Sequence, residues 1–250
     1  MGRAIVEAAN SIEGCTIVAG VERAGSSQIG QSMDSIGLEA EGPIVSRLED
    51  APKADVVIDF STPDSTIAIA RAARDRGLAV VSGTTGLRPE QLEELQSLSQ
   101  TIPILYSPNM SVGVNVLLSL IETATSQLGS DWDIEVTEAH HHHKVDAPSG
   151  TAKKILQVIT ESSETEHATD VQYGREGHTG ARSSREIGMH VIRGGDVVGD
   201  HTVMYYGAGE RLEITHRATD RAIFARGALR AANWLAGQSP GYYTLKDMLG

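Results

Sequence analysis

The chain has 250 residues, of which 40% are hydrophobic and 22% charged, a composition typical of a folded globular protein. Its formal net charge is -12 and it has no run of lysine and arginine, which disfavours nucleic-acid binding because that function needs a basic surface. No apolar run reaches the roughly 20 residues that span a bilayer, no signal peptide is recognisable, and the single cysteine, Cys15, cannot form an internal disulfide. These features predict a cytoplasmic protein.

The first half of the chain alternates short apolar segments with amphipathic ones. Residues 3–12 predict a helix and residues 15–21 a strand that buries Cys15. Further strands are predicted at 54–60, 78–82 and 102–106, and further helices at 62–76 and 89–99. Repeating β-α units of this kind predict a parallel sheet with right-handed crossovers.

The second half of the chain has a different pattern. Helices are predicted at 112–128, 151–161 and 222–235, strands at 133–139, 187–193, 197–206 and 211–217, and a long polar loop at 162–185. Gly194-Gly195 and Gly207-Ala208-Gly209 mark turns between the last three strands, which predicts an antiparallel meander.

The two patterns predict two domains within an α/β fold. A Rossmann-type parallel-sheet domain is expected at residues 1–110 plus 220–250, and an α+β domain for substrate binding and oligomerisation at residues 111–219. A glycine fingerprint for pyrophosphate needs a strand before it, but the sequence opens at Met1-Gly2-Arg3, at the start of a helix. Either the sequence begins late or the first strand is absent, and we favour the former because losing a central strand would expose two strand edges.

Polar and small residues at three strand ends indicate a dinucleotide site. Glu22 lies where an acidic residue would accept hydrogen bonds from the adenosine ribose, and Arg23 could pair with a 2′-phosphate; the alternative is a solvated charged pair. Small and hydroxyl residues at the next two strand ends would let a flat ring approach the backbone. These are Gly83, Thr84, Thr85 and Gly86, then Ser107, Pro108, Asn109 and Met110.

The segment from Glu138 to Thr151 carries the strongest chemical signal. Its four consecutive histidines could be an affinity tag, but tags sit at termini, and a metal site is disfavoured because adjacent strand residues point to opposite faces and no cysteine completes a ligand set. The third interpretation is acid–base chemistry with anion capture. Histidine titrates near neutrality, Lys144 can donate a proton, and Ser149-Gly150-Thr151 opens a helix whose amides suit a carboxylate.

The block E-A-H-H-H-H-K-V-D-A-P-S-G-T resembles the signature of the dihydrodipicolinate reductase (4-hydroxy-tetrahydrodipicolinate reductase) family of the diaminopimelate route to lysine. Further segments occur in that family's order, so the resemblance covers essentially the whole chain. These are Val21–Arg23, Ile58–Phe60, Gly83–Gly86, Asn109–Asn115, Arg175–Gly180 and Gly209–His216.

The resemblance implies roles for individual residues. His140 matches the catalytic histidine and Lys144 the proton-donating lysine, whereas His141, Gly150 and Thr151 match the residues that hold the substrate's carboxylates. The cofactor residues are matched at both ends of the dinucleotide. Glu22 and Arg23 match the adenosine contacts, and Gly83, Thr84, Thr85, Ser107, Pro108, Asn109 and Met110 match the nicotinamide side.

The resemblance also implies the reaction and the assembly. The expected activity is reduction of 4-hydroxy-tetrahydrodipicolinate to tetrahydrodipicolinate with NADH or NADPH, by a homotetramer joined through its substrate-domain sheets. Thr62 stands where some members carry an arginine, which weakens the argument for a strong NADPH preference. Two alternatives remain: an amino-acid dehydrogenase of the aspartate type, and a non-catalytic relative if the first strand is truly absent.

Overall fold

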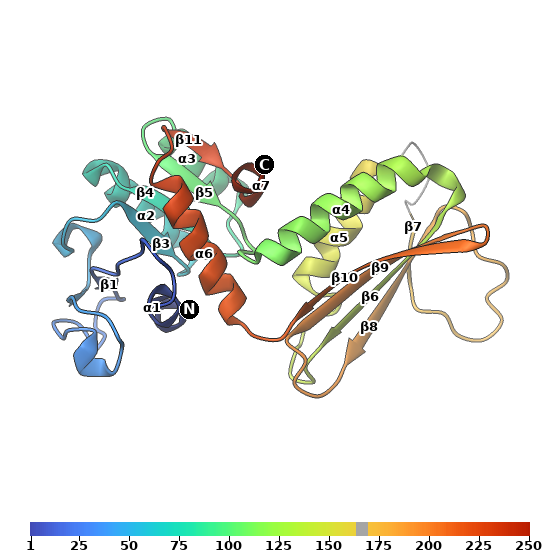
Figure 1. Cartoon of the computed structure of the whole chain (residues 1–250), viewed down its shortest axis with the longest axis horizontal. Coiled ribbons are helices and arrows are strands. Elements are labelled where there is room, and N and C mark those ends of the chain that lie inside the picture. Colours follow the sequence, from blue (N-terminus) through green and yellow to red (C-terminus); the bar gives the residue numbers. More distant parts are fainter. Residues whose placement is uncertain (164–169) are drawn as a thin grey trace. The chain divides into compact units, whose positions relative to one another are not determined.

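The computed structural model describes residues 1–163 and 170–250, which fold into two compact units (Figure 1). The first unit comprises Met1–Val112 together with Ala222–Gly250, and the second comprises Gly113–Arg221. No helix among the described residues is both long and apolar enough to cross a membrane.

The first unit is built on a four-stranded parallel sheet, in the order β11-β5-β4-β3. Its strands are β3 (Val56–Asp59), β4 (Ala79–Ser82), β5 (Pro103–Tyr106) and β11 (Gly241–Tyr243). All four residues of β4 are buried, as expected for a strand that helices cover on both faces. The parallel sheet predicted from the alternating pattern is confirmed.

Helices pack on both faces of this sheet. On one face lie α2 (Pro63–Arg76) and α3 (Pro89–Leu98), and on the other α6 (Ala222–Leu235), with α1 (Gly2–Ala9) and α7 (Leu245–Leu249) packed against α6. Local sequence signals set the ends of α2: Thr62 is the N-cap residue, Pro63 occupies the first turn, and Gly77 ends the helix at φ 66°. The described residues also include short 3-10 helices at Asp34–Ile36, Leu48–Asp50 and Gly129–Asp131.

The strand predicted at Cys15–Val21 is largely wrong. Only Gly20–Val21 (β1) is a strand; it pairs with Ile44–Val45 (β2), and among the described residues no strand joins this pair to the four-stranded sheet. A strand needs a neighbour for its backbone groups, and residues 15–19 find none. Cys15 is accordingly half-buried, and its thiol donates to Asn233 Oδ1 at 3.0 Å.

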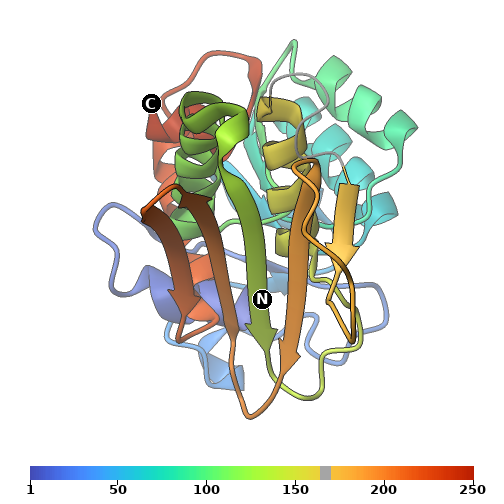
Figure 2. The same cartoon turned by 90° about the vertical axis from the view of Figure 1, so that its right-hand side faces the viewer.

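The second unit is a five-stranded sheet in the order β10-β9-β6-β8-β7, with α4 (Val112–Leu128) and α5 (Gly150–Ser162) against one face (Figure 2). The strands are β6 (Asp133–His140), β7 (Asp170–Tyr173), β8 (Glu186–Arg193), β9 (Gly199–Gly207) and β10 (Glu210–Ala218). The core lies between the helices and the sheet and contains Ile121, Val136, Ile155, Met189 and Val203.

The antiparallel meander is correct for β9 and β10 but wrong for β8. Strand β6 lies between β8 and β9, parallel to the first and antiparallel to the second. The Gly194-Gly195 turn is therefore part of a connection that passes across the end of β6. The amide of His141 donates to Val197 O, and that of His142 to Gly195 O.

The loop predicted at 162–185 contains a short edge strand, β7, which pairs in parallel with β8. Residues 164–169 of that predicted loop lie outside the described residues. The segment after β7, residues 174–185, is attached to the sheet by hydrogen bonds from Arg175 and Arg182 to Glu135 on β6. Its carboxylate accepts hydrogen bonds from Arg175 Nη2 at 2.8 Å, Arg182 Nε at 3.1 Å and His190 Nε2 at 2.8 Å.

Two features of the sequence make this attachment possible. Gly188 faces Glu135 across the sheet, and a Cβ at Gly188 would collide with the carboxylate. Partial burial opposes ionisation of Glu135, but hydrogen bonds from Arg175, His190 and Arg182 outweigh it and hold the pKa at about 2. The ionised carboxylate thus stabilises the fold at neutral pH.

We expect Glu135→Gln to lower the free energy of unfolding by about 3 kcal/mol at pH 7. Because the folded-state pKa is depressed, this contribution is present above the unfolded pKa and is lost as the pH falls from about 4 toward 2. Urea unfolding at pH 7 and at pH 2.5 measures the difference. Glu161→Gln, on the exposed side of α5, is the control, and an equal loss of stability at both pH values would contradict the prediction.

Candidate functional site

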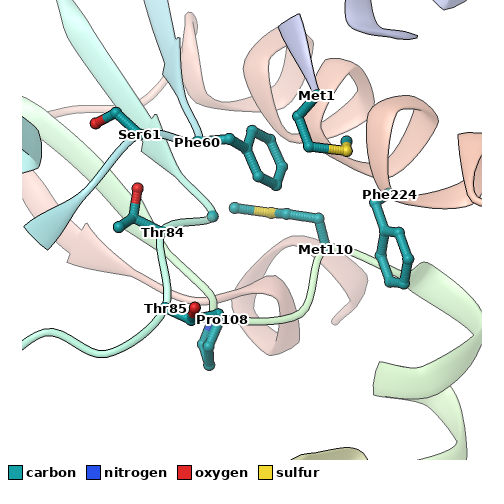
Figure 3. Close-up of a pocket in the computed structure, with 9 residues that line it drawn as sticks. Met1, Phe60, Ser61, Thr84, Thr85, Pro108, Met110 and Phe224 are labelled. Atoms are coloured by element: carbon teal, nitrogen blue, oxygen red, sulfur yellow. The ribbon is translucent and has the colours of Figure 1, made fainter. Parts of the chain in front are cut away.

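In the first unit, a cavity of about 300 Å³ opens at the carboxyl ends of β3 and β4 (Figure 3). Aromatic and thioether side chains form its apolar part, and threonine and serine residues its polar part. The lining residues are Met1, Phe60, Ser61, Gly83, Thr84, Thr85, Pro108, Met110 and Phe224. The carboxyl edge of a parallel sheet is where dinucleotides bind in α/β folds.

Gly83 and Met110 shape the floor of this cavity. The Phe60 ring lies so close to Gly83 that a Cβ there would collide with it. Met110 is buried and shares a hydrophobic cluster with Phe60 and Phe224, and its carbonyl packs so closely on α6 that Gly227 has no room for a Cβ. The floor is therefore flat, apolar and fixed.

A buried carboxylate holds the polar edge of the cavity, and the sequence did not single it out. Asp59 Oδ2 accepts hydrogen bonds from the hydroxyls of Thr66 at 2.6 Å, Thr84 at 2.9 Å and Ser82 at 3.1 Å. Its Oδ1 accepts from the Ser61 amide at 3.1 Å. Asp59 thus ties the ends of β3 and β4 and the start of α2 together.

The segment after β5 forms the opposite rim. Ser107 donates its hydroxyl to Asn109 O at 2.8 Å, and the Asn109 side chain accepts from the Ser111 amide at 2.9 Å. Pro108 and Met110 line the cavity, whereas Ser107 and Asn109 shape the turn that presents them. This set fits a flat ring such as nicotinamide, because a flat apolar floor is edged by Thr84 and Thr85.

Glu22 and Arg23 follow β1 and do not belong to the described lining of the cavity. Arg23 is exposed, and its amide donates to Glu22 Oε1 at 3.0 Å. The predicted cofactor residues therefore fall into two groups in the first unit: seven residues around the cavity and its rim, and this charged pair after β1.

In the second unit, His140 is buried at the end of β6 and is held by Glu138, two residues earlier on the same face of the strand. Its Nδ1 lies 2.6 Å from Glu138 Oε2. Arg193, on the neighbouring strand β8, donates to both carboxylate oxygens at 2.8 and 2.9 Å. Although burial opposes ionisation, hydrogen bonds from Arg193 and His140 keep the pKa of Glu138 below its usual range.

A second buried histidine packs against the first. The rings of His140 and His201 meet edge to face with centroids 5.2 Å apart, and His201 Nε2 lies 3.1 Å from the hydroxyl of Ser149. Burial and the neighbouring His140 lower the pKa of His201 to about 4. His201 is therefore neutral in the physiological range.

His141 and Lys144 lie on the connection between β6 and α5. Lys144 Nζ forms an ion pair with Asp146 Oδ1 at 2.8 Å, and its amide donates to the carbonyl of His141. Burial and the positive charge of Arg221 lower the pKa of His141, with smaller effects from His143, His140 and Lys144. His141 is thus surrounded by groups that favour its neutral form and attract an anion.

The N-terminus of α5 completes this group. Ser149 is the N-cap residue and accepts from the Ala152 amide at 3.1 Å, while Gly150 and Thr151 form the first turn. No atom lies within 4 Å of where a Cβ of Gly150 would be, so a ligand can approach its backbone. First-turn amides lack intrahelical acceptors and suit a carboxylate.

The second unit therefore brings together all five predicted residues between His140 and Thr151, whereas the predicted cofactor residues all lie in the first. Among the described residues, no group of three or more His, Cys, Asp or Glu side chains could hold a metal ion. Sequence reasoning missed Asp59, Arg193 and His201. Glu138 could have been found from its spacing, because it shares a strand face with His140.

Two family models match the chain. The model described as dihydrodipicolinate reductase, N-terminus, matches residues 1–110, and the model described as dihydrodipicolinate reductase, C-terminus, matches residues 113–249. Together they span both units.

Similar proteins carry the corresponding name. The chain is 47% identical over 253 residues to the 4-hydroxy-tetrahydrodipicolinate reductase of Alkalilimnicola ehrlichii, covering 100% of this chain and 95% of that one. It is 44% identical to the enzyme of the same name from Thiobacillus denitrificans, covering 100% and 94%. Among solved structures, the dipicolinate-bound dihydrodipicolinate reductase of Paenisporosarcina sp. TG-14 has the same fold, with a TM-score of 0.79 at 24% identity over 99% of this chain and 94% of that one.

Proposed function

The chain belongs to the dihydrodipicolinate reductase family, and on that premise we propose how its own residues carry out the reaction. It is an oxidoreductase of the diaminopimelate route of lysine biosynthesis that uses a nicotinamide cofactor to reduce 4-hydroxy-tetrahydrodipicolinate to tetrahydrodipicolinate. Family membership favours this activity over an aspartate-type dehydrogenase and over a non-catalytic relative. A cytoplasmic location, testable by cell fractionation, is part of the proposal and agrees with the single free cysteine, Cys15.

One observation carries the assignment of the reacting groups. Within the second unit, an imidazole held by a carboxylate, a lysine ammonium and the first turn of a helix all lie on or beside one connection, residues 140–151. Two negative charges on a small ring need this combination, because cations and helix amides neutralise carboxylates from different sides.

The roles follow from the chemistry of each group. The first-turn amides of Gly150 and Thr151 and the imidazole of His141 hold the substrate's carboxylates. The reduced nicotinamide, when bound beside Gly83, Thr84 and Thr85, supplies the hydride. Conjugate reduction with loss of water adds one hydride and one proton, and Lys144 donates the proton while its positive charge stabilises the negative charge that develops on the ring.

The state of Lys144 supports this role. Its ammonium is paired with Asp146 at 2.8 Å and is only 20% exposed, so a proton is present at a defined place before the substrate arrives. His140 exchanges its proton at Nε2, because Nδ1 is already bonded to Glu138.

We expect Lys144→Ala to lower kcat at least 100-fold and to leave the KM for NADH within about two-fold, because proton transfer is lost while the cofactor contacts stay. The decrease in NADH absorbance with 4-hydroxy-tetrahydrodipicolinate as substrate measures both constants. Lys154→Ala, on the exposed side of α5, is the matched control. A kcat within a few-fold of the wild-type value would exclude Lys144 as the proton donor.

Both NADH and NADPH are proposed cofactors. Glu22 carries the carboxylate that suits the free ribose hydroxyls of NADH, and Arg23 beside it carries the charge that suits a 2′-phosphate. Thr62, at the start of α2, adds no second cation. The two residues should therefore favour different cofactors.

Single substitutions test this division. We expect Arg23→Leu to raise the KM for NADPH about ten-fold and to leave the KM for NADH within about two-fold, since only the 2′-phosphate loses a partner. Glu22→Gln should raise the KM for NADH more than that for NADPH. Steady-state kinetics with NADH and with NADPH measure these KM values. Equal changes of the two KM values in either variant would reject the proposed roles of Glu22 and Arg23.

A homotetramer joined through the second unit is also proposed. Helices α4 and α5 cover one face of the five-stranded sheet, and Figure 2 shows the other face without a covering helix. On that face Thr137, Thr202 and Thr215 lie in register across β6, β9 and β10. Short, uncharged side chains in a row let a second sheet approach closely.

Sedimentation equilibrium should give the mass of four chains for the wild-type protein. Thr202→Glu places a charge on the central part of this face and should yield a smaller species with an unchanged circular dichroism spectrum. Lys154→Glu on α5 is the control and should remain tetrameric. A Thr202→Glu protein of unchanged mass would place the interface elsewhere.

A further inference from the structure

Glu138 uses the whole bonding capacity of its carboxylate within the protein. The residue is 1% exposed. Its Oε2 accepts from His140 Nδ1 and Arg193 Nη1, and its Oε1 accepts from Arg193 Nη2 and from the Ser149 amide at 3.0 Å. These donors come from β6, β8 and the start of α5, so one buried group connects three elements of the site.

This contact determines the tautomer of His140. An ionised carboxylate only accepts hydrogen bonds, so Nδ1 of His140 must carry a hydrogen. In the neutral ring Nε2 is then the basic nitrogen, and every proton exchange takes place there. Gly199 on β9 makes room for it, because a Cβ at Gly199 would lie 3.0 Å from His140 Nε2.

Arg193 sets how strongly the Glu138 carboxylate favours the imidazolium form of His140. An unpaired buried carboxylate would strongly favour the imidazolium ion, whereas a carboxylate bound to a guanidinium presents little net charge. Two further titratable groups lie close to His140: His201, packed against it from β9, and its neighbour His141. Arg193 also donates to Asp146 O at 2.7 Å, so it fixes the connection that carries Lys144.

We propose that Glu138 and Arg193 are positioning residues for the acid–base step: together they hold His140 in the Nδ1–H tautomer, set the pH at which it protonates, and tie it to the first turn of α5. This inference rests on the proposed acid–base role of His140. It requires that removing Glu138 and removing Arg193 shift the protonation of His140 in opposite directions.

The test is a titration of the His140 ring, followed by nitrogen NMR of isotope-labelled histidine and assigned by comparison with His140→Gln. In Glu138→Gln we expect the pKa of His140 to fall by about one unit or more, because the carboxylate that stabilises the imidazolium is lost. In Arg193→Met it should rise by about one unit, because the same carboxylate is no longer neutralised. Arg193→Lys keeps the positive charge, so in this variant the pKa of His140 should stay near its wild-type value.

Kinetics add a second measurement. Glu138→Gln should lower kcat at least ten-fold, shift the corresponding limb of the pH profile to lower pH, and leave the KM for NADH within about two-fold. Glu135→Gln is the matched control: it lies on the same strand and binds an arginine in the same way, but it faces the opposite side of the sheet. It should leave the pH profile in place.

Three results would overturn the inference: an unchanged His140 titration in Glu138→Gln, shifts of the same sign in Glu138→Gln and Arg193→Met, or equal effects of Glu138→Gln and Glu135→Gln. If Glu138→Gln does not fold, the comparison of Arg193→Met with Arg193→Lys still decides. A wild-type protein without reductase activity would reject the proposed function instead, and the NMR titration would remain valid.

Discussion

A carboxylate taken out of water must be matched by donors, and this requirement organises the second unit. Glu138 lies inside the protein at the edge of the site, and its four hydrogen bonds reach β6, β8 and α5. The positions of His140, Arg193 and Ser149 are therefore not independent of one another. This one group thus connects the imidazole of His140 to the N-terminus of α5.

In the first unit, a buried carboxylate, Asp59, is also matched by donors, but these are hydroxyl and amide groups without charge. Asp59 accepts hydrogen bonds from three hydroxyls and one amide. The bonds fix the chain where β3 and β4 end, which is where Gly83 and Thr84 edge the cavity. In both units, a buried acid near the carboxyl end of a strand thus bonds to a later segment of the chain and fixes its position.

On the other face of β6, the carboxylate of Glu135 is likewise matched by several donors, but there it attaches a surface segment. Its partners, Arg175, Arg182 and His190, attach the segment after β7 to the sheet and do not contact Glu138 on the opposite face. Alternation along β6 separates the two tasks: Glu135 serves one face, and Glu138 and His140 serve the other. One strand therefore carries two carboxylates that hold different segments of the second unit.

Sequence periodicity and helix-end residues determined most local elements, because these signals act between residues close in the chain. The helices at 112–128 and 222–235 and the ends of α2 at Thr62 and Gly77 follow from them. The block from Glu138 to Thr151 was likewise visible, since its residues are contiguous in the chain. For the same reason, the resemblance to the reductase family could be recognised before any fold was known.

Tertiary structure alone decided which segments became neighbours. It placed β6 between β8 and β9, although a glycine turn connects β8 and β9 in sequence. It also gave residues 15–19 no strand partner within the part of the chain that the structure describes. Arg193 reaches Glu138 across 55 positions of the chain, and Thr84 reaches Asp59 across 25. Pairings of this kind depend on sheet order and on the cost of burying an unpaired charge, and no local pattern encodes either.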